Sequence, residues 1–156
     1  HGSDARGAAG FPNLTDADWQ WGNSEQALIA TLTHGRNGIM PALGSALGGD
    51  AGVDNMVSYV RSLSGLEDAG AGASAQPMFV ALCSACHGVD GKGNQMLGGP
   101  NLTDEAWLYG SGASTVRTTI MQGRNGMMPA HGNLLGDARV RILAAYVASL
   151  PERQGQ

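Results

Sequence analysis

The chain contains an internal repeat. Residues 12–22 read PNLTDADWQWG and residues 100–110 read PNLTDEAWLYG, so seven of eleven positions match at an offset of 88 residues. At the same offset, GRNGIMPA (35–42) matches GRNGMMPA (123–130) at seven of eight positions. A repeat of this length is the signature of a duplicated structural unit. The sequence therefore predicts two copies of one module.

The two copies differ at their starts. AQPMFVALCSAC precedes His87, whereas the aligned residue of the first copy, His1, opens the sequence. We expect a first domain at residues 1–66 that lacks its N-terminal helix, and a second, fuller domain at residues 77–156. The small residues of 67–76 are expected to form a flexible linker between them.

Apolar residues recur at helical spacing in both copies. Positions i, i+3, i+4 and i+7 are filled from residue 28 and again from residue 116, and each run ends at a glycine, Gly35 or Gly123. A last helix is expected after Asp137 and is expected to end at Pro151. The alternating pattern of a β-strand does not occur at useful length, so the expected fold class is all-α.

The composition excludes some functions. Charged residues make up 14% of the chain, the net charge is −4, and Lys and Arg form no run, which argues against a nucleic-acid partner. No apolar stretch reaches the roughly 18 residues of a membrane-spanning helix. Aromatic residues make up only 5%, so two small domains would have thin cores that a bound group would help to fill.

One pentapeptide carries distinctive chemistry. Cys83, Cys86 and His87 form C-x-x-C-H, and on a helical turn the three side chains share one side. This is the motif of c-type haem attachment. A disulfide would be strained at this spacing, a thioredoxin-like site needs a βαβ context, and a zinc site needs a second ligand pair. The sequence favours haem over these three alternatives.

Methionine and histidine are the usual second axial ligands of haem iron. Met128 lies before a proline in GRNGMMPA, and Met40 holds the same place in the first copy. Met127 is a rival to Met128, but its counterpart is Ile39, which cannot bind iron. The repeat therefore selects Met128 and Met40.

The remaining candidate site residues fall into two groups: those with no counterpart in the other copy and those that match across the copies. His34 and His131 have no histidine counterpart, and we interpret them as surface or supporting residues. Trp19 and Trp107 match across the copies and serve either as core packing or as indole donors to a haem propionate. Arg36 and Arg124 also match and are either propionate partners or solvated loop charges.

In their motifs, the modules resemble class I cytochrome c domains. The tandem PNLTDxxWxxG and GRNGxMPA segments resemble, more narrowly, the dihaem subunit (subunit III) of cbb3-type cytochrome c oxidases, over nearly the whole chain. The resemblance implies two haem c groups. Cys83 and Cys86 would carry the thioethers of one, and a Cys pair upstream of His1 would carry those of the other.

The resemblance also implies the ligand sets. His87 and Met128 would bind the iron in the second domain, and His1 and Met40 would bind it in the first. The carbonyl oxygens of Pro100 and Pro12 would accept hydrogen bonds from the proximal histidines and orient them.

The function implied by the resemblance is electron transfer without catalysis by this chain itself. Electrons would pass from a soluble cytochrome c through these haems to the oxygen-reducing subunit, on the periplasmic side of the bacterial inner membrane. Membrane attachment would use N-terminal helices that this sequence lacks.

Three alternatives fit the motifs less closely. A free soluble periplasmic dihaem cytochrome c and an electron-acceptor domain of a dehydrogenase share the same chemistry. A dihaem peroxidase-like enzyme would need an open iron site, but both methionine loops are intact and no His/Glu pair lies beside them.

Overall fold

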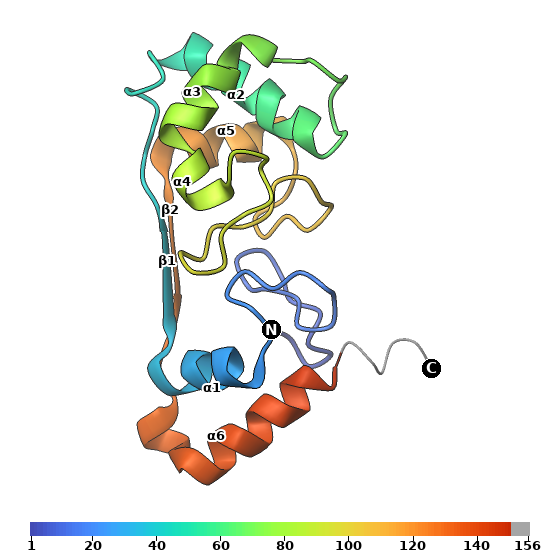
Figure 1. The fold of residues 1–156 in the computed structure, drawn as a ribbon, viewed down its shortest axis with the longest axis vertical. Coiled ribbons are helices and arrows are strands. Elements are labelled where there is room, and N and C mark those ends of the chain that lie inside the picture. The colour runs from blue at the N-terminus through green and yellow to red at the C-terminus, as the bar shows by residue number, and fades with distance from the viewer. Residues whose placement is uncertain (151–156) are drawn as a thin grey trace. The chain divides into compact units, whose positions relative to one another are not determined.

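The computed structural model describes residues 1–150 (Figure 1). The elements follow one another as α1 (Glu25–His34), β1 (Arg36–Met40), α2 (Asp50–Leu63), the 3-10 helix η1 (Ala73–Ala75), α3 (Gln76–Leu82), α4 (Ser84–His87), α5 (Ala113–Gln122), β2 (Arg124–Met128) and α6 (Gly132–Ala148).

Corresponding helices of the two repeats begin and end alike. Ser24 caps α1, because its side chain accepts a hydrogen bond from the Ala27 amide. Gly35 and Gly123 end α1 and α5 at φ values of 72° and 75°, which glycine adopts without strain. Both expected helix ends are confirmed. The N-cap of α5 is Gly112, which makes no side-chain capping bond, and Ser114, a preferred capping residue type, lies two residues further on.

The expectation of an all-α fold requires a correction. Directly after α1 and α5, the segments RNGIM and RNGMM form β1 and β2, which pair with each other in a two-stranded sheet. Their side chains alternate between half-buried and exposed along five residues. Asn and Gly have low strand propensity, so the strands depend on pairing between the two repeats rather than on local preference.

The chain forms two compact units that mix the repeats. Unit 1 contains His1–Asn37 together with the segment from Gly126 onward, and unit 2 contains Gly38–Asn125. This division differs from the expected domains at 1–66 and 77–156. The boundary falls inside β1 and β2, so each unit combines part of one repeat with part of the other.

Unit 2 has a core between helices of different repeats. Helix α2 of the first repeat packs against α5 of the second, and η1 and α3 also contact α2 (Figure 1). Phe79 of α3 is fully buried, and its ring meets that of Tyr59 edge to face at 5.3 Å. The segment expected as a flexible linker contains η1, whose Ala75 is buried in this core.

Unit 1 also has a core between helices of different repeats. Helix α1 of the first repeat packs against α6 of the second, burying Leu28, Leu32, Val140 and Ala144. The backbone of α6 is kinked at Gly136, where φ is 70°. Val140 and Ala144 lie on the buried face, as the helical pattern predicts. Pro151, the expected end of the helix, lies outside the described residues.

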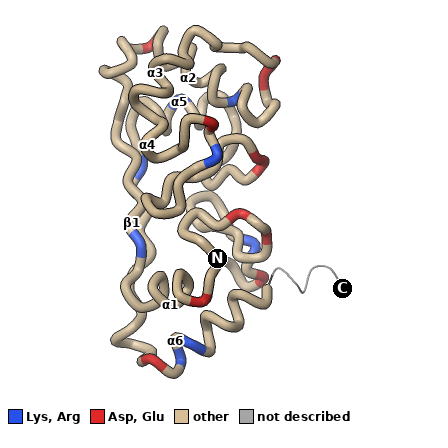
Figure 2. Tube along the Cα trace, in the orientation of Figure 1, with Lys and Arg blue, Asp and Glu red and all other residues tan. Residues whose placement is uncertain are grey.

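No described helix is suited to span a membrane, and charges of both signs are interspersed along the described chain (Figure 2). None of the helices within residues 1–150 is long and apolar enough to cross a membrane. Figure 2 shows Lys and Arg scattered among Asp and Glu along the tube, with no run of basic positions.

Candidate haem-binding sites

The C-x-x-C-H motif lies at a junction of two short helices in unit 2. Cys83 follows α3, while Cys86 and His87 lie on α4. Both cysteines are free and half-buried, so their sulfur atoms are available for other bonds. Burial raises the pKa of the Cys83 thiol, and the nearby Cys86 raises it further. Cys83 is therefore a neutral thiol at neutral pH.

His87 is held in one orientation by a backbone carbonyl. Its ring is 8% exposed, and Nδ1 lies 3.0 Å from the carbonyl oxygen of Pro100. Because that oxygen only accepts, Nδ1 carries the proton, and the lone pair of Nε2 remains available for a metal. Burial lowers the pKa of His87, although the bond to Pro100 opposes this. The neutral imidazole, which is the ligating form, is therefore favoured.

The loop that carries Pro100 is fixed by its own side chains. Asn101 Oδ1 accepts from both the amide and the hydroxyl of Thr103, at 2.9 and 2.8 Å. Gly93, at φ 86°, runs so close to this segment that a side chain there would collide with the backbone of Pro100 and Asn101. These contacts explain why PNLTD is a structural motif: it positions the proline carbonyl.

Unit 1 repeats this arrangement around the first histidine. His1 Nδ1 lies 2.7 Å from the carbonyl oxygen of Pro12. Asn13 Oδ1 accepts from the amide and hydroxyl of Thr15, at 2.9 and 2.7 Å. Gly7, at φ 76°, approaches Pro12 as Gly93 approaches Pro100. The backbone around His1 thus already has the form found around His87.

The two shared methionines lie in the units opposite to those expected. Met40 of the first repeat packs against the core of unit 2, which Cys83 and Trp107 also contact. Met128 of the second repeat packs against the core of unit 1, together with Trp19. The structure therefore groups His87 with Met40, and His1 with Met128. The expected pairing by repeat was His87 with Met128 and His1 with Met40.

The residues that precede these two methionines in the sequence point away from the cores. Met127 is 73% exposed and Ile39 is 64% exposed, whereas Met128 and Met40 are half-buried. Alternation along β1 and β2 produces this difference, because successive strand side chains face opposite sides.

The paired arginines are held by contacts that also repeat. The Arg36 guanidinium lies 4.8 Å from the Trp21 ring centre, and the Arg124 guanidinium lies 4.5 Å from that of Tyr109. Each Nε donates to the hydroxyl of the threonine five residues earlier, Thr31 at 2.8 Å and Thr119 at 2.9 Å. The sequence analysis missed these supporting residues, although an aromatic and a threonine stand at both positions of the repeat.

The unshared histidines lie apart from these arrangements. His34 is exposed in the last turn of α1, and His131 precedes α6, with a buried Nδ1 that lacks a hydrogen-bond partner. Within residues 1–150, no group of three His, Cys, Asp or Glu side chains is placed to hold a metal ion by itself.

Comparison with known proteins decides the family. The family described as "Cytochrome C oxidase, cbb3-type, subunit III" matches residues 1–60 and 70–147. The chain belongs to this family. Membership in a family of c-type cytochromes implies covalently bound haem c. The residues fit that group, because unit 2 offers two free thiols, a neutral imidazole with an available Nε2 and a methionine on one core.

Relatives of the family are similar along almost the whole chain. The cbb3-type cytochrome c oxidase subunit FixP of Azorhizobium caulinodans is 44% identical over 160 residues, covering 96% of this chain and 54% of its own length. Subunit CcoP of Rubrivivax gelatinosus is 43% identical over 152 residues, covering 97% of this chain and 50% of its own length. The chain thus spans about half the length of these relatives.

Proposed function

We propose that this chain is the dihaem electron-transfer part of a cbb3-type cytochrome c oxidase, with one haem c in each unit. One arrangement carries the proposal: a histidine oriented by a proline carbonyl, which occurs in both units. In unit 2 it stands beside the free Cys83 and Cys86. Unit 1 would use a Cys pair upstream of His1.

The axial ligands are proposed to cross between the repeats. His87 and Met40 would bind one iron, and His1 and Met128 would bind the other. The support is that each pair belongs to one compact unit and that each methionine packs against that unit's core. The four proposed ligands are the residues that the sequence analysis selected. Each histidine is now paired with the methionine of the other repeat.

Each residue type has a distinct task in this proposal. Bound haem supplies a one-electron couple between ferric and ferrous iron, and ligation by methionine favours a high reduction potential. Pro100 and Pro12 fix the imidazole orientation. The apolar cores around Met40 and Met128 exclude water, which disfavours the additional charge of the ferric state. No group is proposed to move a proton.

The arginines and tryptophans that match between the two repeats are proposed to act at the haem edge. Arg36 and Arg124 are rigidly held cations, and each would pair with a propionate in its own unit. Trp19 packs against the same core as Met128, and Trp107 against the same core as Met40, and each would contact the porphyrin in its own unit.

The proposed electron path leads from a soluble cytochrome c, through these haems, to the oxygen-reducing subunit of the oxidase. The chain itself would catalyse no reaction. The names and lengths of the relatives support this placement, because each is a subunit of a cbb3-type oxidase with a further stretch of chain beyond the matched half. The units would face the periplasm, and the unmatched part would carry the membrane attachment.

Counting haems in the intact subunit tests the proposal. A pyridine haemochrome assay should find two c-type haems per chain, and both should stay with the polypeptide after extraction with acidified acetone. In the variant Cys83→Ala/Cys86→Ala, only the haem of unit 1 should stay. One haem in the unaltered subunit, or none, would refute the dihaem assignment.

A further inference from the structure

The helices that pack across the repeats occupy equivalent positions in the two units. Unit 2 pairs α5 with α2, and unit 1 pairs α1 with α6. Helices α1 and α5 align at an offset of 88 residues, and α2 and α6 align at an offset of 87 through VSYVRSL (57–63) and AAYVASL (144–150). If each repeat folded on itself, α1 would pack on α2 and α5 on α6. Side chains that differ between the copies therefore decide between the two arrangements.

One such difference is a charge at the edge of the contact in unit 2. Arg117 of α5 lies between two carboxylates of α2: its Nη2 donates to Asp50 Oδ1 at 2.5 Å, and its Nε donates to Asp54 Oδ1 at 2.7 Å. The two aspartates stand four residues apart on α2, where like charges destabilise a helix. A cation between them removes this repulsion, so Arg117 suits α2.

At the equivalent positions, unit 1 has charges that complete each other. Ile29 of α1 is the counterpart of Arg117, and it packs against the core of unit 1. The counterparts of the two α2 aspartates are Asp137 and Arg141 of α6. Their opposite charges stand four residues apart on one helix, so an apolar partner on α1 leaves no charge unbalanced.

Folding of each repeat on itself would lose both advantages. Arg117 would then face Asp137 and Arg141, one carboxylate and one cation in place of two carboxylates. Ile29 would face the two α2 aspartates and leave them without a cation. Exposed ion pairs contribute little each, but here the difference only has to distinguish two arrangements that are otherwise equivalent.

The second difference is the size of buried side chains on the same faces. Leu28 of α1 corresponds to the smaller Val116 of α5, and Ala144 of α6 corresponds to the larger Val57 of α2. All four are buried, and the observed units combine the leucine with the alanine and the two valines with each other. In the alternative, Leu28 with Val57 would crowd one core. Val116 with Ala144 would leave a void in the other.

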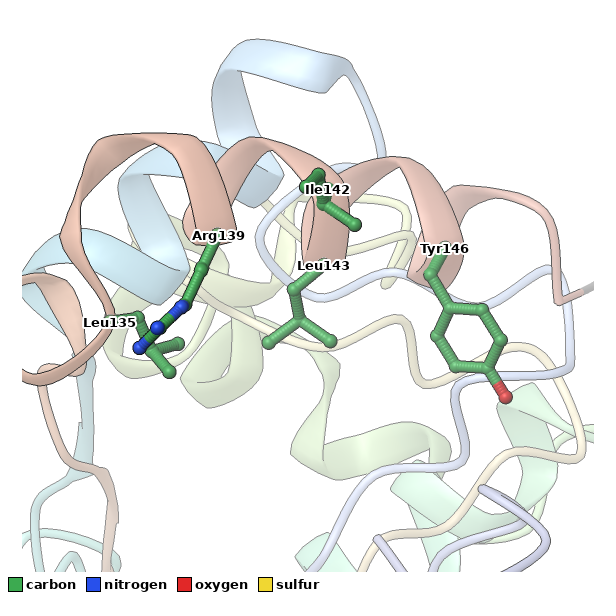
Figure 3. Close-up of a pocket in the computed structure, with 5 residues that line it drawn as sticks. All are labelled: Leu135, Arg139, Ile142, Leu143 and Tyr146. Atoms are coloured by element: carbon green, nitrogen blue, oxygen red, sulfur yellow. The ribbon is translucent and has the colours of Figure 1, made fainter.

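The open side of α6 takes no part in this comparison. Ile142 and Tyr146 are 70% and 49% exposed, and they line a pocket of about 400 Å³ (Figure 3). Ala144, in contrast, is 1% exposed. The difference in size thus concerns the buried face of α6 that packs with α1.

We propose that these charges and sizes select the crossed arrangement, in which each unit combines helices of both repeats. The pairing residues are Leu28, Ile29, Asp50, Asp54, Val57, Val116, Arg117, Asp137, Arg141 and Ala144. Met40 precedes α2 and Met128 precedes α6, so the helix partner also decides which methionine enters which unit. The inference goes beyond the proposed electron transfer and does not depend on which atoms bind iron. It becomes visible only once the structure shows which helix faces meet.

Crosslinking of the intact, haem-loaded subunit measures which helices meet. Glu25 of α1 and Ala145 of α6 line one pocket, so cysteines introduced at positions 25 and 145 lie close together in the crossed arrangement. The position on α2 that corresponds to Ala145 is Ser58. With a short bis-maleimide, the yield for positions 25 and 145 should exceed that for 25 and 58 by about tenfold or more. Mass spectrometry identifies the joined positions and separates them from products of Cys83 and Cys86.

An exchange variant tests the pairing residues themselves. Ile29→Arg/Arg117→Ile moves the cation to α1, and Val57→Ala/Ala144→Val exchanges the buried sizes between α2 and α6. Together they should lower the ratio of the two yields by about tenfold or more. The matched control is Leu32→Ile/Ile120→Leu, which exchanges two buried side chains of equal size between α1 and α5 and should leave the ratio unchanged.

The outcomes separate clearly. If the fourfold variant does not fold, the charge exchange Ile29→Arg/Arg117→Ile alone decides, because it changes no fully buried side chain and should still lower the ratio several-fold. An unchanged ratio in a folded exchange variant would overturn the proposal, as would an equal fall in the control. A higher yield for 25 and 58 in the unaltered protein would also overturn it. The haem count, which tests the proposed function, is a separate measurement.

Discussion

A carbonyl oxygen orients each candidate histidine ligand. Pro100 and Pro12 accept from Nδ1 of His87 and His1, and the asparagine after each proline holds the loop in place. The asparagine bonds join residues two positions apart, so they depend only on the motif itself. The histidine contacts span 11 and 13 residues, and they could be predicted only through the resemblance to a family.

Other residue-level features could not be predicted. The stacking of Arg124 on Tyr109 and of Arg36 on Trp21 depends on where a strand places its first side chain relative to a loop. The sequence analysis noted the arginines but had no geometry to link them to the aromatic rings.

The first prediction concerns the choice between adjacent methionines. Met128→Leu in the haem-loaded protein should remove the weak charge-transfer band of the ferric His/Met haem in unit 1, because leucine offers no ligand. Met127→Leu should leave this band unchanged, because Met127 is 73% exposed. Optical spectra of the ferric proteins make the comparison. Loss of the band in Met127→Leu would mean that the strand register places the other sulfur at the iron.

The second prediction concerns the stability of the haem-free chain as a function of pH. Burial lowers the pKa of His87 in the folded state from its ordinary value of 6.5, so the unfolded chain takes up the proton first as the pH falls. The contribution of His87 to stability is therefore complete above about pH 6.5 and is lost as the pH falls through the lowered folded-state pKa.

Urea unfolding followed by circular dichroism measures this effect. Between about pH 8 and pH 5, the free energy of unfolding should fall more steeply for the unaltered chain than for His87→Gln, which has no imidazole at this position to titrate. If the free energy of unfolding changed equally with pH in the two proteins, the buried imidazole would not contribute to the pH dependence of stability.

At the scale of elements, the helices were more predictable than the strands. Periodic apolar residues and terminal glycines specify α1 and α5, and both helices are present within a few residues of their expected ends. The strands β1 and β2 contain an asparagine and a glycine and are only five residues long. Each strand forms mainly because it pairs with the other strand. The two strands are far apart in the sequence, so this pairing leaves no local sequence pattern.

The third prediction uses the glycines that end α1 and α5. Gly123 has a positive φ, and a Cβ there would collide with the carbonyl oxygen of Met40. Gly123→Ala should therefore destabilise the protein by more than about 1 kcal/mol and disturb the position of Met40. Gly35 stands in the same relation to Met128, so Gly35→Ala is the matched variant.

Reduction potentials of the two haems provide the readout for these variants. Gly123→Ala should shift the potential of the haem attached to Cys83 and Cys86, and Gly35→Ala should shift that of the other haem. A reversed assignment would contradict the position of each methionine relative to its glycine.

The fourth prediction concerns the core of unit 2. Phe79 is completely buried between α3 and α2, so Phe79→Ala should lower the free energy of unfolding by about 3–5 kcal/mol. The control is Val80→Ala on the same helix, because Val80 is 44% exposed and should cost much less. Denaturant titrations of the haem-loaded proteins measure both. A loss at Phe79 no greater than that at Val80 would mean that α3 does not pack on α2.

At the scale of the whole molecule, the repeat made one question impossible to answer from sequence. Two nearly identical GRNGxMPA segments fit either haem site equally well, so local pattern cannot say which copy completes which unit. The same exchangeability underlies domain swapping between identical chains. The expected domains at 1–66 and 77–156 assumed that each copy folds on itself, whereas the compact units combine the copies.

The combined units have a physical consequence for the protein. Each proposed iron site depends on both repeats, so neither repeat alone would supply a histidine and a methionine in one core. Binding of either proposed haem would then require both repeats.

The most direct test of this account is a crystal structure of the haem-loaded protein, with both irons located by anomalous scattering at the iron absorption edge. The account predicts that the iron bound by His87 Nε2 is also bound by the sulfur of Met40, and that His1 and Met128 share the other iron. An iron bound by both His87 and Met128 would contradict it.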